Sequence, residues 1–121
     1  MPNHCSNTLR IYGTEKQISR LQKFVEITKS EATEQHNATE FSCHKIIPRP
    51  SSQDSNWYDW NCNNWGSKWD CYDIDVDDSQ AEQGNLVYNF STAWSPIVSV
   101  IEKLANKFKK LEFNYSYYET G

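Results

Sequence analysis

Two segments with helical periodicity stand among segments of alternating polarity, and their order restricts the fold more than any other feature. In residues 14–29, apolar side chains recur at three- and four-residue spacing behind Thr14 and Gln17, which form a capping box. Residues 95–108 repeat this spacing, and Ser95 is expected to cap the second helix. Both segments are therefore predicted to be amphipathic helices.

Four further segments alternate in the way that half-buried strands do: residues 5–12, 67–77, 86–92 and 111–118. The chain therefore runs strand, helix, strand, strand, helix, strand, which is the order of the split β-α-β, or ferredoxin-like, arrangement. We predict an α+β sandwich, in which a four-stranded antiparallel sheet carries both helices on one face.

Residues 41–66 do not fit this order and are read as a tryptophan-rich insertion in a single domain spanning residues 1–121. A short strand is expected at residues 41–47, and Pro48 and Pro50 are expected to end it. A short helix is expected to follow, with Asp54 or Ser55 as its cap and Gly66 at its end.

The chain shows no apolar run long enough for a signal peptide or a membrane span, so we expect a cytoplasmic protein without membrane contact. Thiols stay reduced in the cytoplasm, and the four cysteines include no closely spaced pair of the kind that binds zinc. We therefore expect ordinary thiols and no metal or other cofactor.

The net charge of -4 and the predicted open face of the sheet both argue against nucleic-acid binding. Alternation places Asp73, Asp75 and Asp77 on that face, where they would repel phosphate. The one lysine cluster, in residues 103–110, falls at the end of the second helix, where cations complement the helix dipole.

No catalytic pattern is present, because the chain lacks phosphate-binding glycine motifs and its three histidines have no defined partner. We expect a protein that is not an enzyme and name no catalytic residue. For a test of activity, the first residues to mutate are Cys43, His44 and Cys71.

The tryptophans allow two interpretations, which overlap: a second hydrophobic cluster that anchors the insertion, or a recognition surface, since Trp and Tyr dominate interface hot spots. The candidate partner- or ligand-binding residues are Trp57, Tyr58, Trp60, Asn64, Trp65, Lys68, Trp69 and Trp94. A candidate acidic surface consists of Asp70, Asp73, Asp75, Asp77, Asp78 and Glu82.

Five short motifs follow one another along the chain: MPNHCSN (1–7), IIPRP (46–50), WY (57–58), NWGSKW (64–69) and STAWSP (91–96). In this order they resemble the YubB ferredoxin-like family, whose members occur in bacteriophages, prophages and conjugative plasmids and are mostly of unknown function. The resemblance implies a ferredoxin-like fold and a mobile-element origin, and it implies no catalytic residues. The chain departs from the family at His4, where Trp is frequent, and near residues 70–72, where Asn-Ala-Tyr is commoner.

The leading hypothesis is an accessory protein of a phage or plasmid that acts in the bacterial host cell and binds a host or defence-system protein. In one version, the acidic surface imitates nucleic acid and occupies a nucleic-acid channel. In the alternative, the tryptophan cluster forms a small-molecule pocket that sequesters a nucleotide-like signal by ring stacking.

Overall fold

The computed structural model describes residues 3–120. Its elements, in chain order, are β1 (His4–Tyr12), α1 (Glu15–Val25), α2 (Cys43–Ile46), the 3₁₀ helix η1 (Ser51–Asn56), α3 (Trp57–Asn64), β2 (Tyr72–Asp77), the 3₁₀ helix η2 (Ala81–Gln83), β3 (Asn85–Ala93), α4 (Val98–Lys107) and β4 (Glu112–Thr120).

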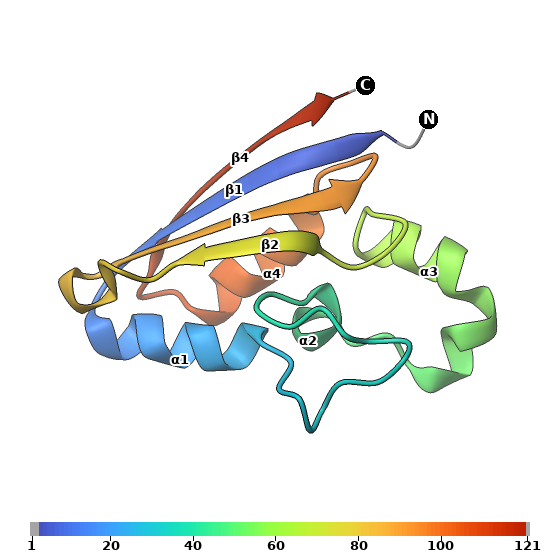
Figure 1. The fold of residues 1–121 in the computed structure, drawn as a ribbon, viewed down its shortest axis with the longest axis horizontal. Coiled ribbons are helices and arrows are strands. Elements are labelled where there is room, and N and C mark those ends of the chain that lie inside the picture. Colours follow the sequence, from blue (N-terminus) through green and yellow to red (C-terminus); the bar gives the residue numbers. More distant parts are fainter. Residues whose placement is uncertain (1–2, 121) are drawn as a thin grey trace.

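The four strands form one antiparallel sheet in the order β2-β3-β1-β4. Helices α1 and α4 cover one face of this sheet, α2 lies on the same side next to them, and α3 lies at one end of the molecule (Figure 1). The predicted ferredoxin-like α+β fold is confirmed. Within residues 3–120, no helix has the length and apolar character needed to cross a bilayer.

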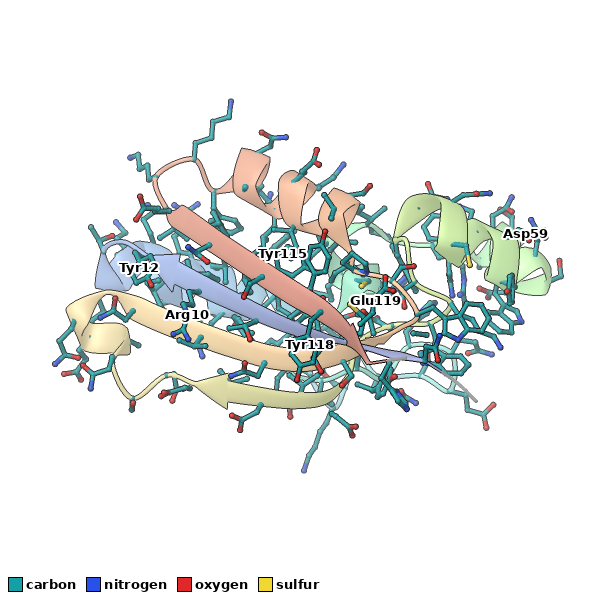
Figure 2. All side chains as sticks on the ribbon, turned by 90° about the horizontal axis from the view of Figure 1, so that it is seen from above. Arg10, Tyr12, Asp59, Tyr115, Tyr118 and Glu119 are labelled. Atoms are coloured by element: carbon teal, nitrogen blue, oxygen red, sulfur yellow. The ribbon has the colours of Figure 1, made fainter. Side chains whose placement is uncertain are left out.

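The two faces of the sheet differ in the way that alternation predicts. Leu9 and Ile11 of β1 and Leu86 and Tyr88 of β3 are buried against the helices. The opposite, open face includes Arg10, and it is the face seen in Figure 2. Burial of the apolar row supplies the main driving force for closing the helices onto the sheet.

Strand β2 begins later than expected and contains a bulge. Tyr72 is in register with Ser91 and Asp75 with Asn89, so β2 has one more residue than β3 between these pairs. Asp73 lies in this interval with φ at 50°, in the left-handed region. The extra residue places Tyr72 and Asp75 on the same face.

Helix α1 begins as predicted, with the Thr14 hydroxyl accepting the Gln17 N–H at 3.2 Å, but it ends at Val25 instead of residue 29. The next residues are extended because their backbone groups pair with a neighbouring segment. Ile27 donates its N–H to Thr39, and Ser42 donates to Val25. These bonds replace the next helical turn.

Helix α4 begins at Val98, so the expected capping role of Ser95 is wrong. The Ser95 carbonyl accepts the Thr92 hydroxyl at 2.7 Å, and the Ile97 N–H donates to the Tyr115 hydroxyl at 3.0 Å. A tyrosine of β4 therefore satisfies a backbone donor at the entry to this helix.

The strand predicted at residues 41–47 is wrong, because this segment forms the helical turn α2. The Ser42 hydroxyl accepts the Lys45 N–H and so caps the amino terminus of this turn. Phe41 is buried all the same, with its ring centroid 5.0 Å from those of Tyr88 and Phe90. The apolar residues of the segment thus join the core through a turn and not through a strand.

The predicted helix in the tryptophan-rich segment is present as α3. Its expected end at Gly66 is confirmed: the N–H groups of Trp65 and Gly66 both donate to the Asn61 carbonyl, and Gly66 has φ at 86°. Glycine adopts this left-handed conformation without steric cost, which lets the chain turn back toward β2.

Candidate recognition surface

Trp65 anchors the tryptophan-rich segment in the hydrophobic core. Its side chain is only 1% exposed, and its indole N–H donates to the Ile47 carbonyl at 2.8 Å. Trp60 packs edge-on against it, with ring centroids 5.6 Å apart. These two tryptophans therefore fill space inside the molecule.

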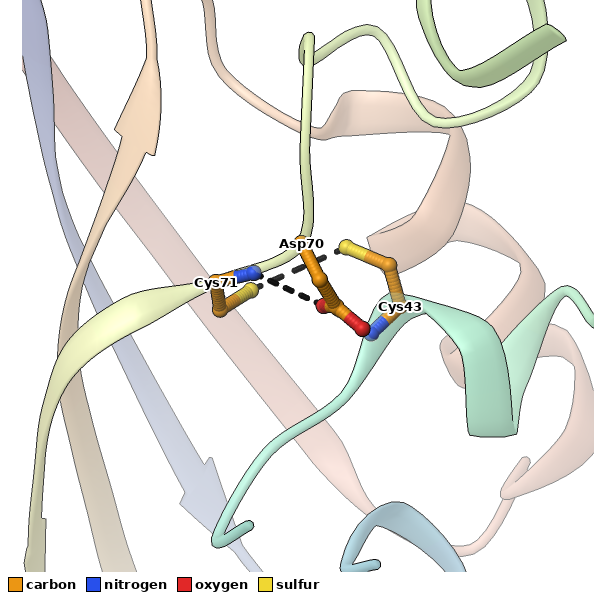
Figure 3. Close-up of side chains that lie close together, drawn as sticks. All are labelled: Cys43, Asp70 and Cys71. Atoms are coloured by element: carbon orange, nitrogen blue, oxygen red, sulfur yellow. Dashed lines mark hydrogen bonds between the residues drawn. The ribbon is translucent and has the colours of Figure 1, made fainter. Parts of the chain in front are cut away.

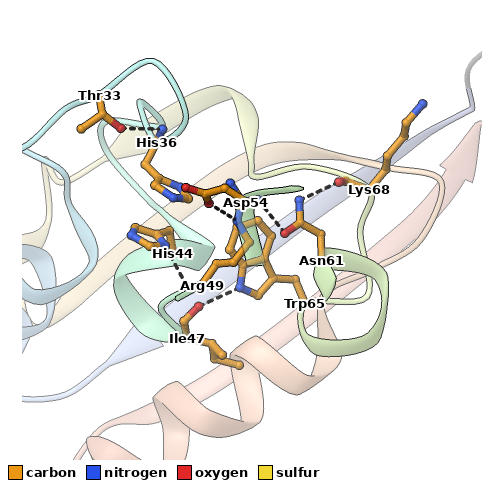
Figure 4. Close-up of polar contacts among 9 residues, drawn as sticks. All are labelled: Thr33, His36, His44, Ile47, Arg49, Asp54, Asn61, Trp65 and Lys68. Atoms are coloured by element: carbon orange, nitrogen blue, oxygen red, sulfur yellow. Dashed lines mark hydrogen bonds and ion pairs between the residues drawn. The ribbon is translucent and has the colours of Figure 1, made fainter. Parts of the chain in front are cut away.

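A buried arginine joins the start of this segment to α3 (Figure 4). Arg49 donates from Nε to Asp54 at 3.1 Å and from Nη1 to Asn61 at 3.0 Å, and its guanidinium lies 6.0 Å from the Trp65 ring centroid. Asn61 in turn donates to the Lys68 carbonyl at 2.9 Å. The network therefore joins η1, α3 and the segment that follows α3.

The carboxylate of Asp70 attaches the segment to the sheet edge (Figure 3). It accepts four hydrogen bonds: from the Ser42 hydroxyl at 2.7 Å and from the backbone N–H groups of Cys43 at 2.6 Å, His44 at 3.3 Å and Cys71 at 2.7 Å. Asp70 therefore caps α2 from a position directly before β2. A carboxylate is suited to this place because it only accepts hydrogen bonds.

Cys43, Asp70 and Cys71 lie close enough together to raise the question of a metal site, with the two sulfurs 3.7 Å apart. The donor set does not suit one. Each Asp70 oxygen already accepts two hydrogen bonds, which uses the roughly four lone-pair positions of a carboxylate. Zinc prefers four ligands that are deprotonated, and only these three groups come together among the described residues.

The same surroundings make the two thiols poor nucleophiles. Both side chains are buried, and burial raises the pKa of Cys43 well above its ordinary value and raises the pKa of Cys71. Reactive cysteines have a lowered pKa and partial exposure. His44 does not compensate, because its Nδ1 accepts the Arg49 N–H at 3.0 Å.

Four exposed rings and one half-buried lysine form a contiguous group, called here the aromatic surface: Trp57, Tyr58, Lys68, Trp69 and Trp94. The four rings are 39–42% exposed. Tyr58 connects them, with ring centroids 5.9 Å from Trp57 and 6.3 Å from Trp94. Large aromatic side chains that gather at the surface commonly mark interaction sites.

Lys68 holds the rings of this surface together. Its ammonium nitrogen lies 5.4 Å from the ring centroid of Tyr58, 4.9 Å from that of Trp69 and 5.2 Å from that of Trp94. Cation–π contacts of this length each contribute about 0.5–1 kcal/mol at exposed sites. Three of the four rings are therefore gathered around one ammonium group.

Trp94 is also strained in its backbone, with φ at 71° directly after β3. A bulky side chain rarely occupies the left-handed region, where the conformation costs about 1–2 kcal/mol. Its N–H donates to the Asn3 carbonyl at 3.0 Å, which fixes the residue at this point. The fold thus places a large apolar ring at the surface against its backbone preference.

A cleft of about 240 Å³ adjoins the aromatic surface, and Trp57 and Trp69 belong to both. Its walls are apolar at Trp65 and charged at Arg49 and Asp54, and Gln35, Asn61 and Asp70 complete its lining.

A stacked pair of histidines supports the segment that carries Arg49. The rings of His36 and His44 are parallel within 4° at a centroid distance of 3.4 Å. Burial lowers the pKa of both histidines. The charge of Arg49 lowers the pKa of His36 further, and the charges of His36 and Arg49 lower the pKa of His44 further. The neutral imidazole is therefore the form that fits this stack.

The predicted binding residues thus separate into two groups. Trp60, Asn64 and Trp65 are partly or fully buried, and Asn64 donates to the Trp60 carbonyl within α3. The other five make up the aromatic surface. Of the predicted acidic residues, Asp70 lies apart in its hydrogen-bonded position, and the exposed ones are Asp73, Asp75, Asp77, Asp78 and Glu82.

Sequence reasoning missed Arg49, Asn61 and the histidine pair. Asn61 lies four residues before Trp65, on the same side of α3, and this spacing was the available signal. Arg49 and the histidines gave no such signal, because their partners lie on separate elements.

Replacing Asp70 with Asn is expected to lower the free energy of unfolding by about 3 kcal/mol, because an amide nitrogen would face N–H donors that have no other acceptor. Urea denaturation measures this value. The matched control is Asp75→Asn, at an exposed position of β2, which should change the free energy of unfolding by less than about 0.5 kcal/mol. Equal losses in both variants would contradict the capping role of Asp70.

Stability is also expected to fall on acidification, because the folded state holds His36 and His44 with a lowered pKa. Below pH 6.5, roughly the pKa of an unfolded histidine, the unfolded state binds more protons. The contribution of the two neutral histidines to the free energy of unfolding is therefore complete above that pH. It is lost as the pH falls through the lowered pKa values that they have in the folded state. Urea denaturation between pH 7.5 and 5 measures the slope of the free energy of unfolding against pH.

The slope should become smaller in His36→Gln, which removes one of the two stacked imidazoles. A slope that is the same in wild type and His36→Gln would show that the stack does not cause the pH dependence.

The comparisons with known proteins concern the carboxyl-terminal part of the chain. Residues 65–121 match the family described as "ferredoxin-like domain in Api92-like protein". The matched region contains Lys68, Trp69 and Trp94 and extends through β4. No curated protein and no solved structure matches the chain. The family match and the observed sheet topology together establish a ferredoxin-like domain of a kind whose function is unknown.

Proposed function

We propose that this chain is a non-enzymatic binding protein that recognises a protein partner through the aromatic surface. The observation that carries the proposal is Trp94, a bulky residue in the left-handed region whose ring is 40% exposed. Strained residues of this kind are found at ligand clamps and switch regions. Stability alone gives no reason to place a ring there.

The chemistry of the surface supports a protein partner over a small molecule. Its rings are about 40% exposed, whereas small-molecule sites bury most of the ligand in pockets of roughly 300–1,000 Å³. The adjoining cleft of about 240 Å³ is smaller than this. A single side chain of a partner protein suits the cleft better than the nucleotide-like ligand of the alternative hypothesis.

The partner we propose is a host or defence-system protein of a bacterial cell, with the chain acting as an accessory protein of a phage or plasmid. The support for this origin is the resemblance of the motifs at 46–50, 64–69 and 91–96 to the YubB family. Segment 46–50 contains Arg49, which joins the start of the tryptophan-rich segment to α3, and segments 64–69 and 91–96 contain Lys68, Trp69 and Trp94. The resemblance therefore includes residues of the aromatic surface.

The test is capture of a partner from host lysate with the full chain and with matched variants. Wild type and Tyr118→Ala, which removes a 65% exposed ring on β4, should retain the same partner. Trp69→Ala and Trp94→Ala should each reduce its recovery by tenfold or more, because hot-spot rings contribute about 2 kcal/mol or more. Equal recovery with all four proteins would refute the proposal.

The acidic residues support a second version, in which the chain imitates nucleic acid. Asp73, Asp75, Asp77, Asp78 and Glu82 are exposed, and none of them forms an ion pair within residues 3–120. The net charge of -4 adds to their field.

Charge reversal separates the two versions. The double variant Asp73→Lys and Asp75→Lys should abolish partner binding if the acidic residues occupy a nucleic-acid channel, and it should leave binding within about twofold if the aromatic surface is sufficient. Titration of the captured partner with each variant measures this. Binding that survives charge reversal rules out nucleic-acid imitation.

A further inference from the structure

A second concave region lies in the helical layer, where α1 meets the end of α4. The two helices border a hollow of about 550 Å³, which is within the range of small-molecule sites. Its lining consists of Gln17, Arg20, Phe24, Asn106, Lys107, Phe108, Lys109 and Lys110.

The charge of this lining is entirely positive. Arg20, Lys107, Lys109 and Lys110 contribute four cations, and no carboxylate is among the lining residues. None of the four forms an ion pair within residues 3–120, where the two ion pairs involve Lys45 and Arg49. In a chain with a net charge of -4, this is a marked separation of charge.

The dipole of α4 does not account for so many cations. A helix carboxyl terminus carries about half of one negative charge. One lysine near this end, such as Lys107 in the last turn, is sufficient to complement it. Arg20 belongs to a different helix, α1, and still lines the same hollow.

The floor of the hollow is aromatic. Phe24 and Phe108 pack together with ring centroids 5.7 Å apart, and the Lys107 ammonium lies 4.7 Å from the Phe24 centroid. Phe108 is buried, and Lys107 occupies one face of the half-buried Phe24 ring, so the lining offers little ring surface to an aromatic ligand. The groups that offer contacts are the cations and the amides of Gln17 and Asn106.

We propose that this hollow binds a small polyanion carrying two or three linked phosphate groups. Four cations suit a ligand with three or four negative charges, and the side-chain amides donate further hydrogen bonds to phosphate oxygens. Because the lining offers little ring surface for stacking on a base, inorganic triphosphate and nucleoside triphosphates should bind with similar affinity. This site is independent of the aromatic surface.

The experiment is isothermal titration of the full chain with sodium tripolyphosphate and, separately, with ATP. We expect binding of both ligands, with affinities within a factor of about three, that weakens as salt is raised. The double variant Lys107→Gln and Lys110→Gln should weaken binding at least about tenfold, and Arg20→Gln alone should weaken it about threefold.

The matched control removes the same charge elsewhere, as Lys29→Gln and Lys103→Gln, two residues outside the lining. It should change the affinity less than about twofold. Circular dichroism of each variant shows whether it is folded.

Three results would overturn the proposal: no binding of tripolyphosphate at millimolar concentration, equal weakening by the control and hollow variants, or tighter binding to a single-stranded oligonucleotide or to anionic lipid vesicles than to tripolyphosphate. The last result would assign the cations to a macromolecular surface instead of a small ligand.

Discussion

The hydrogen bonds of the Asp70 carboxylate are the interaction on which the rest of the structure depends. They join the start of β2 to the amino terminus of α2, two segments that are 27 residues apart in sequence. Without this connection, the insertion would be held at its chain ends and by the side chains that it buries. With it, four hydrogen bonds tie the insertion to the sheet edge, and the aromatic surface, which both contribute to, acquires a defined geometry.

This attachment explains how five tryptophans in one small domain serve two purposes. Trp65 is buried and hydrogen-bonded, and Arg49 packs on it, so this side of the segment provides stability. Trp69 and Trp94 lie outside the insertion, are exposed and are held around Lys68, so they are available for contact. Anchoring and presentation are therefore carried out by different tryptophans, and a variant can disturb one without the other.

The sequence predicts the sheet and both long helices well, because alternation and helical spacing are local signals. It fails at residues 41–47, where apolar residues typical of a strand form a helical turn whose amino-terminal N–H groups are bound by Asp70, far along the chain. The sequence also places Asp70 with the acidic surface, because a local pattern gives no sign of a hydrogen-bond partner on another element. Arg20 and Lys107 illustrate the limit again, since only the packing of α1 beside α4 brings them to one hollow.

The central claim is that the aromatic surface is presented in the free protein and covered by a partner. Incorporation of 5-fluorotryptophan gives one fluorine resonance for each of the five tryptophans, and a soluble paramagnetic agent broadens those that solvent reaches. The account predicts strong broadening for Trp57, Trp69 and Trp94 and none for Trp65, with loss of the broadening of these three when the captured partner is added. Protection of these rings in the free chain, or unchanged broadening in the complex, would contradict it.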